Sequence, residues 1–129
     1  MNVQSAADAY RKGAIENAPP LQIVQMLYKG ALGFLQRAGR LDPAAEGVEF
    51  NNCLGRAEAI VTELRCCLRH EVAPELTKDL DALYVFVEGQ IAEASIKRTT
   101  EPVENSVQVL STLLNAWSSV DVQNIDNAH

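Results

Sequence analysis

The chain has 129 residues, enough for one domain with a sizeable core, and 47% of them are hydrophobic while only 5% are aromatic. Ala, Leu and Val dominate the apolar residues, a mixture that favours helices over a β-sandwich. Seventeen acidic against eleven basic residues give a formal net charge of -6, which argues against DNA, RNA and anionic membrane surfaces as partners because little positive charge is left to meet phosphates.

The first predicted elements are an arm and a helix. Residues 1–18 are polar and Ala-rich with isolated apolar positions such as Tyr10, so we interpret them as a short mobile N-terminal arm. Pro19 and Pro20 suit the first turn of a helix, which we expect to end near Leu41 because Pro43 follows.

Three further helices are predicted after this one, at about 49–70, 74–98 and 101–119. Four helices of about 20 residues joined by short loops must alternate in direction. The predicted fold is therefore an all-α, antiparallel up-down four-helix bundle of residues 19–120, with the arm before it and a flexible tail of residues 121–129 after it.

Each of the three later helices has one clear apolar stripe at alternating steps of three and four, which predicts its core face. The stripes are Phe50, Leu54, Ala57, Val61, Leu64 and Leu68; Leu76, Leu80, Leu83, Val87, Ile91 and Ala94; and Val103, Val107, Leu110, Leu114 and Trp117.

The first helix has two such stripes, and both cannot face one seam. One is Ile23, Leu27, Gly30, Phe34 and Leu41, and the other is Leu21, Val24, Tyr28, Leu32 and Leu35. The third helix adds Val85 and Phe86, and the fourth adds Val109, Leu113, Ala116 and Val120. The surplus predicts a surface groove for an amphipathic helix, although any single residue could instead flank a wide core. We expect Leu21, Val24, Tyr28 and Leu32 to face the partner.

Residues that could carry chemistry are scarce. The chain has only two histidines, the terminal His129 and His70, which is predicted near the end of the second helix, where a histidine interacts with the helix dipole. Cys53, Cys66 and Cys67 share one predicted helix, which excludes a disulfide among them, and their spacing does not fit a zinc site. We expect no enzyme, no cofactor and no metal; a phosphotransfer protein is the enzymatic alternative and depends on His70.

Several blocks of sequence, in order, carry a family resemblance. They are residues 20–32 (PLQIVQMLYKGAL); Asn52, Leu54, Ala57, Ile60, Val61, Glu63, Leu64 and Leu68; Glu71, Glu75, Leu80, Leu83 and Tyr84; and Leu113, Leu114, Ala116 and Trp117. Taken together, the chain resembles the flagellin-specific export chaperones of bacterial flagella, the FliS family.

This resemblance implies a cytoplasmic chaperone that binds the C-terminal helical segment of flagellin, prevents its premature polymerisation and aids its export. It also implies contact with the cytoplasmic domain of an export-gate membrane protein through that complex. Tyr10 matches a family tyrosine that can cover the apolar binding surface, although the arm could equally be disordered. A self-associating helical scaffold or adaptor without a flagellar client remains the main alternative, and a homodimer of the free chain stays open.

Overall fold

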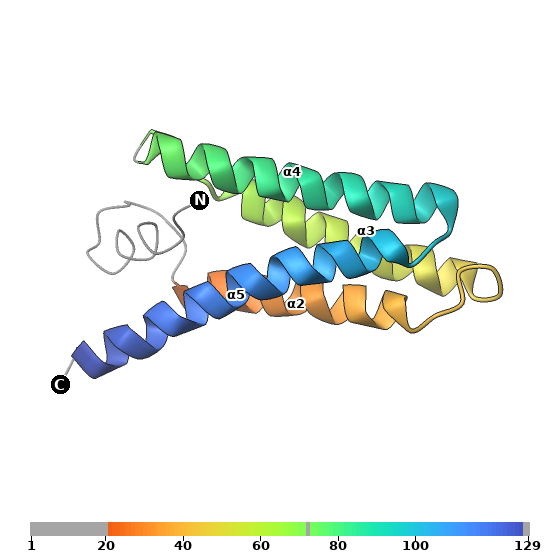
Figure 1. Ribbon diagram of the computed structural model, residues 1–129, viewed down its shortest axis with the longest axis horizontal. Coiled ribbons are helices and arrows are strands. Elements are labelled where there is room, and N and C mark those ends of the chain that lie inside the picture. The colour runs from red at the N-terminus through yellow and green to blue at the C-terminus, as the bar shows by residue number, and fades with distance from the viewer. Residues whose placement is uncertain (1–20, 72, 128–129) are drawn as a thin grey trace.

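The computed structural model describes residues 21–71 and 73–127 (Figure 1). The predicted arm with Tyr10 lies outside these residues. The described helices are α2 (Leu21–Gly39), α3 (Gly47–Cys66), α4 (Pro74–Lys97) and α5 (Glu101–Asn127), and the described part of the chain holds no strand. The predicted all-α class is confirmed.

The four helices form an antiparallel bundle (Figure 1). α2 packs against α3 and α5, and α4 packs against the same two helices. α2 and α4 therefore occupy diagonally opposite corners of the bundle. The α2–α3 and α4–α5 loops lie at one end, and the α3–α4 loop lies at the other together with the start of α2 (Figure 1).

Local chemistry explains most helix ends. α4 begins with Pro74 in its first turn, where the missing amide costs nothing, and Arg98 closes it in the left-handed region with φ 54°. α3 ends at Cys66, earlier than predicted, which leaves His70 on the loop. α5 continues to Asn127, past the predicted end near residue 119, because no glycine or proline follows Pro102 to stop it.

The predicted core faces of α3, α4 and α5 are largely confirmed. The α3 stripe is buried except for the half-buried Leu68. On α4, Tyr84 is buried while Leu83 is half-buried, and on α5 the buried residue is Leu113 in place of Leu114. In each case the buried residue is next in sequence to the predicted one. The buried face of the helix is therefore rotated slightly from the predicted face, and the helix itself is unchanged.

On α2 most of the stripe that was expected to face the partner is buried in the bundle. Val24, Tyr28 and Leu32 are 5%, 0% and 7% exposed and belong to the core, whereas Ile23 is 44% exposed. Leu21 is half-buried against the core. The stripe expected to face the partner is thus largely buried, whereas in the other stripe Ile23 is exposed and the remaining members are half-buried.

Tyr28 explains this outcome. Its hydroxyl is hydrogen-bonded to the hydroxyl of Tyr84 on α4 and accepts a bond of 3.3 Å from Trp117 Nε1 on α5. A buried phenol is tolerated when its polar tip is hydrogen-bonded inside the protein. Tyr28 thereby joins the two diagonal helices through the centre of the bundle.

Candidate protein-binding surface

One face of α2 presents apolar side chains to solvent. Ile23, Met26, Leu27 and Phe34 recur at the spacing that places residues on one side of a helix. Ile23 is 44% and Met26 65% exposed, while Leu27 and Phe34 are half-buried. Together with the half-buried Ile60 of α3, these four residues are called the α2 surface below.

Contacts with α3 fix one edge of the α2 surface. A Cβ atom added to Gly30 would lie 3.3 Å from Ile60 Cδ1, so the glycine makes room for the Ile60 side chain between the two helices. The Arg56 guanidinium lies 5.6 Å from the centre of the Phe34 ring, a cation–π contact. Apolar side chains are therefore held at this edge by α3 before any partner arrives.

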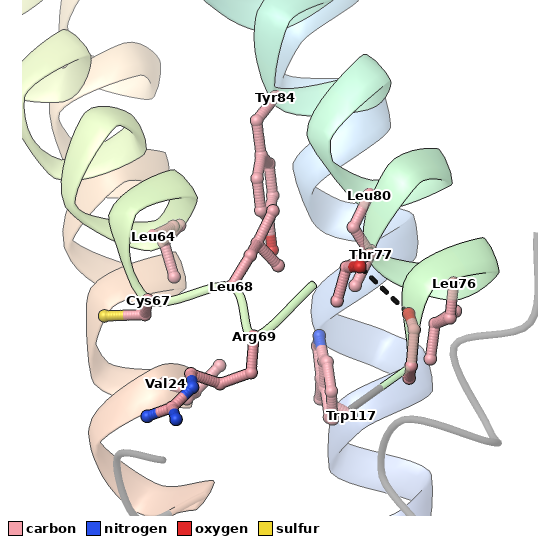
Figure 2. Close-up of a pocket in the computed structure, with 11 residues that line it drawn as sticks. Val24, Leu64, Cys67, Leu68, Arg69, Leu76, Thr77, Leu80, Tyr84 and Trp117 are labelled. Atoms are coloured by element: carbon pink, nitrogen blue, oxygen red, sulfur yellow. Dashed lines mark hydrogen bonds between the residues drawn. The ribbon is translucent and has the colours of Figure 1, made fainter. Parts of the chain in front are cut away.

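A small apolar pocket opens near the N-terminal end of α2 (Figure 2). It is called the end pocket below. Its volume is about 40 Å³, and side chains of all four described helices line it. They include Val24 of α2, Leu64 of α3, Leu76 and Leu80 of α4 and Trp117 of α5. A pocket with such a lining is suited to an apolar group.

The polar groups of the pocket are already satisfied or uncharged. Thr77 Oγ1 donates a hydrogen bond of 2.9 Å to the Ala73 carbonyl, which is the dashed line in Figure 2. Burial raises the pKa of the Cys67 thiol, with Glu63 adding to the effect, so the thiol stays neutral. Arg69, which also lines the pocket, pairs with Glu71 at 2.7 Å. The pocket can therefore receive an apolar side chain, and the guanidinium in its lining is already paired.

The predicted site residues lie in different environments. Val24 lines the pocket and Leu21 lies one turn before it, whereas Tyr28 and Leu32 are enclosed in the core. Tyr10 lies outside the described residues. The exposed Met26 was missed because it belongs to neither apolar stripe of the sequence.

Side chains that bind metals are not clustered in residues 21–71 and 73–127. This part of the chain has no group of three His, Cys, Asp or Glu side chains that could hold a metal ion. His70 is exposed on the α3–α4 loop. None of the helices in the same range is long and apolar enough to cross a membrane.

An acidic helical bundle with apolar side chains at one face and an apolar pocket beside it defines a protein-binding module. A family model described as flagellar protein FliS matches residues 2–124. The chain belongs to this family. Its members are chaperones and not enzymes.

Curated relatives match the chain over most of its length. The flagellar secretion chaperone FliS of Vibrio cholerae is 28% identical over 122 residues, which cover 92% of this chain and 90% of the relative. The protein of the same name from Bacillus subtilis is 26% identical over 117 residues, covering 91% and 86%. That of Salmonella typhimurium is 24% identical over 119 residues, covering 92% and 88%.

Proposed function

We propose that the chain is a cytoplasmic flagellar secretion chaperone that binds the C-terminal helical segment of flagellin, prevents its premature polymerisation and aids its export. The observation that carries this proposal is the exposure of Ile23 and Met26 on α2 beside the apolar end pocket. The names of the relatives support the chaperone role.

The chain is proposed to act by binding its client and not by catalysing a reaction. An amphipathic client helix lays its apolar face along the α2 surface and adds a further helix to the bundle. Burying a fully exposed Ile or Met side chain contributes about 1.5–3 kcal/mol, so Ile23 and Met26, which are already partly covered, each contribute less. Several such contacts are needed to offset the entropy lost when an unfolded client segment becomes ordered.

Burial changes which residues we propose for client contact. Ile23 and Met26 replace Tyr28 and Leu32, because the latter two could reach a client only if the bundle opened. Val24 remains in the proposal because it lines the end pocket, and Leu21 remains because it lies one turn before Val24. Tyr10 remains the proposed movable cover of this surface. Contact with the cytoplasmic domain of an export-gate membrane protein is proposed to follow through the client complex.

A double substitution, Ile23→Glu with Met26→Glu, tests the surface. Both side chains are exposed, so the fold should survive, and we expect at least a tenfold loss of affinity for a flagellin C-terminal peptide in calorimetric titration. Val48→Glu is the matched control, since Val48 is 79% exposed in the first turn of α3, away from the α2 surface. Equal affinity of the double variant and the control would refute the proposal that the α2 surface binds the client.

A second experiment tests the client itself. The chain is coexpressed with full-length flagellin and with flagellin that lacks its C-terminal segment. We expect copurification with the former only. Undiminished recovery of the truncated flagellin would overturn the proposal. Sedimentation of the chain with and without the flagellin peptide distinguishes a client complex from a self-associating scaffold.

A further inference from the structure

A polar cleft lies between α2 and α3, next to the apolar side chains of the α2 surface. Its volume is about 190 Å³, and it is lined by Phe34 and Arg37 of α2 and by Glu49, Asn52, Cys53 and Arg56 of α3. The lining holds two guanidinium groups and one carboxylate, so it carries a net positive charge in a chain whose net charge is -6. We call it the arginine cleft.

The arginine cleft continues the α2 surface. Phe34 belongs to both, and Arg37 follows it by one turn on the same side of α2. From Ile23 to Arg37 the helix rises about 21 Å, which is about four turns. A client helix that lies along the α2 surface from Ile23 therefore reaches the arginine cleft about four turns later.

Arg56 is held in place without being neutralised. Its guanidinium carbon lies 5.6 Å from the centre of the Phe34 ring. No ion pair joins it to an acidic side chain within residues 21–71 and 73–127. An aromatic ring orients a guanidinium through its face and leaves the N–H donors at the edge available. Arg56 can therefore donate to an acceptor that enters the cleft.

Arg37 keeps part of its guanidinium open. Its Nη2 atom lies 2.7 Å from Glu49 Oε1, and 60% of its side chain remains exposed. The same Glu49 oxygen accepts a hydrogen bond of 3.8 Å from Cys53 Sγ. A contact at Nη2 occupies only part of the five N–H donors of a guanidinium, so Arg37 also has donors for a second acceptor.

Both arginines lie near one buried group. Burial raises the pKa of the Cys53 thiol and Glu49 adds to this effect, whereas Arg37 and Arg56 oppose it. The opposing effect of both arginines agrees with two guanidiniums that lie near the same sulfur atom. Asn52, which is exposed at the cleft, adds an amide donor. Donors from three side chains thus surround one space.

We infer that the arginine cleft binds a carboxylate of the client helix, an inference that rests on the proposed function. A carboxylate can accept two parallel hydrogen bonds from one guanidinium, and such charge-assisted pairs are stronger than hydrogen bonds between neutral groups. Glu49 offsets one of the two arginine charges, so the cleft suits a singly charged carboxylate better than a doubly charged phosphate.

The carboxylate would set the register of the client. Contacts between apolar side chains are not directional, so the α2 surface alone would accept a client helix at more than one position along its length. A charge pair at one end of that surface favours a single position. The client recognised in this way carries its carboxylate about four turns from the apolar side chain that covers Ile23.

Calorimetric titration of the full chain with two peptides tests the cleft. One is a flagellin C-terminal peptide, and the other is the same peptide with every Asp changed to Asn, every Glu to Gln and its C-terminus amidated. Arg56→Gln should weaken binding of the first peptide about fivefold and binding of the amide peptide less than about twofold. Because Arg56 is exposed and glutamine is a comparable helix former, the variant should keep its fold, which circular dichroism checks.

Arg40→Gln is the matched control. It removes the same charge from an exposed arginine that lines a groove between α2 and α5 and not the arginine cleft. We expect it to change the affinity for either peptide less than about twofold, and any general effect of charge is measured by it. Equal losses from Arg56→Gln and Arg40→Gln would overturn the inference, because only net charge would then matter.

Two further results distinguish this inference from the proposed function. An equal loss on both peptides, or no loss from Arg56→Gln while Ile23→Glu with Met26→Glu still abolishes binding, would overturn the arginine cleft and leave the proposed function standing. Failure of the unmodified chain to bind either peptide would overturn both.

Restoring the acids of the amide peptide one at a time locates the carboxylate. Sensitivity to Arg56→Gln should return at a single position of the peptide, because one register brings one carboxylate to the cleft. Partial recovery with every acid restored would contradict the inference, since it would indicate a general attraction between the peptide and the chain.

Discussion

Replacing the two glycines of α2 by alanine, one at a time, should separate the helical backbone from the contact with α3. Gly30 and Gly33 both lie in the interior of α2, where glycine is less favourable than alanine by about 0.8–1.0 kcal/mol. Nothing lies within 4 Å of a Cβ atom added to Gly33. Gly33→Ala should therefore gain nearly the full amount.

Gly30→Ala should gain less. Its new methyl group would lie 3.3 Å from Ile60 Cδ1, which is closer than ordinary van der Waals contact, so Ile60 has to shift by a few tenths of an ångström. Urea denaturation gives both free energies of unfolding, and for a domain of this size the Gly33→Ala gain corresponds to a rise in Tm of roughly 3–5 °C.

The combination of Gly30→Ala with Ile60→Val isolates the cause. Valine lacks the Cδ1 atom, so the gain from Gly30→Ala should return to the Gly33→Ala value when both are measured in the Ile60→Val background. Equal gains for Gly30→Ala and Gly33→Ala in the unmodified chain would refute the proposed close approach of α2 and α3.

Three further outcomes follow from burial and ion pairing. Leu110→Ala, at a fully buried position of α5, should lower the free energy of unfolding by about 2–5 kcal/mol in urea melts. Arg65→Ala, which removes the bond to Asp81 between α3 and α4, should lower Tm only slightly, and the difference should shrink as salt is added. Iodoacetamide should label the exposed Cys66 quickly and the buried Cys53 only on unfolding. Burial and Glu49 raise the pKa of the Cys53 thiol, which reduces the amount of reactive thiolate. Equal labelling rates of the two cysteines, measured by mass spectrometry, would contradict the burial of Cys53.

The predictability of each helix depended on how many apolar stripes it had. α3 has one stripe, from Phe50 to Leu68, so its buried face followed from spacing alone. α2 has two stripes of similar quality, and no property of that segment alone decides between them. The choice depends on Tyr28 and its hydrogen bonds to residues 56 and 89 positions away in the sequence, which helical periodicity cannot reveal.

The candidate surface was predicted less well than the fold for the same reason. The sequence indicated that α2 carries more apolar side chains than one seam can bury, and Ile23 is indeed exposed, but Val24, Tyr28 and Leu32, which were expected to face the partner, are buried. Val24 is both a core residue, with 5% of its surface exposed, and a lining residue of the end pocket. A pocket formed by four helices depends on how they splay, and local sequence does not encode that.

The end pocket offers a partner an apolar recess beside the α2 surface. The pocket is open to solvent and is lined mainly by apolar side chains, so water inside it finds few hydrogen-bonding partners. A client side chain that enters the pocket displaces this water and buries apolar surface, which contributes about 25 cal/mol per Å². Because this apolar surface lies in a small recess, the acidic surface around it can continue to oppose aggregation.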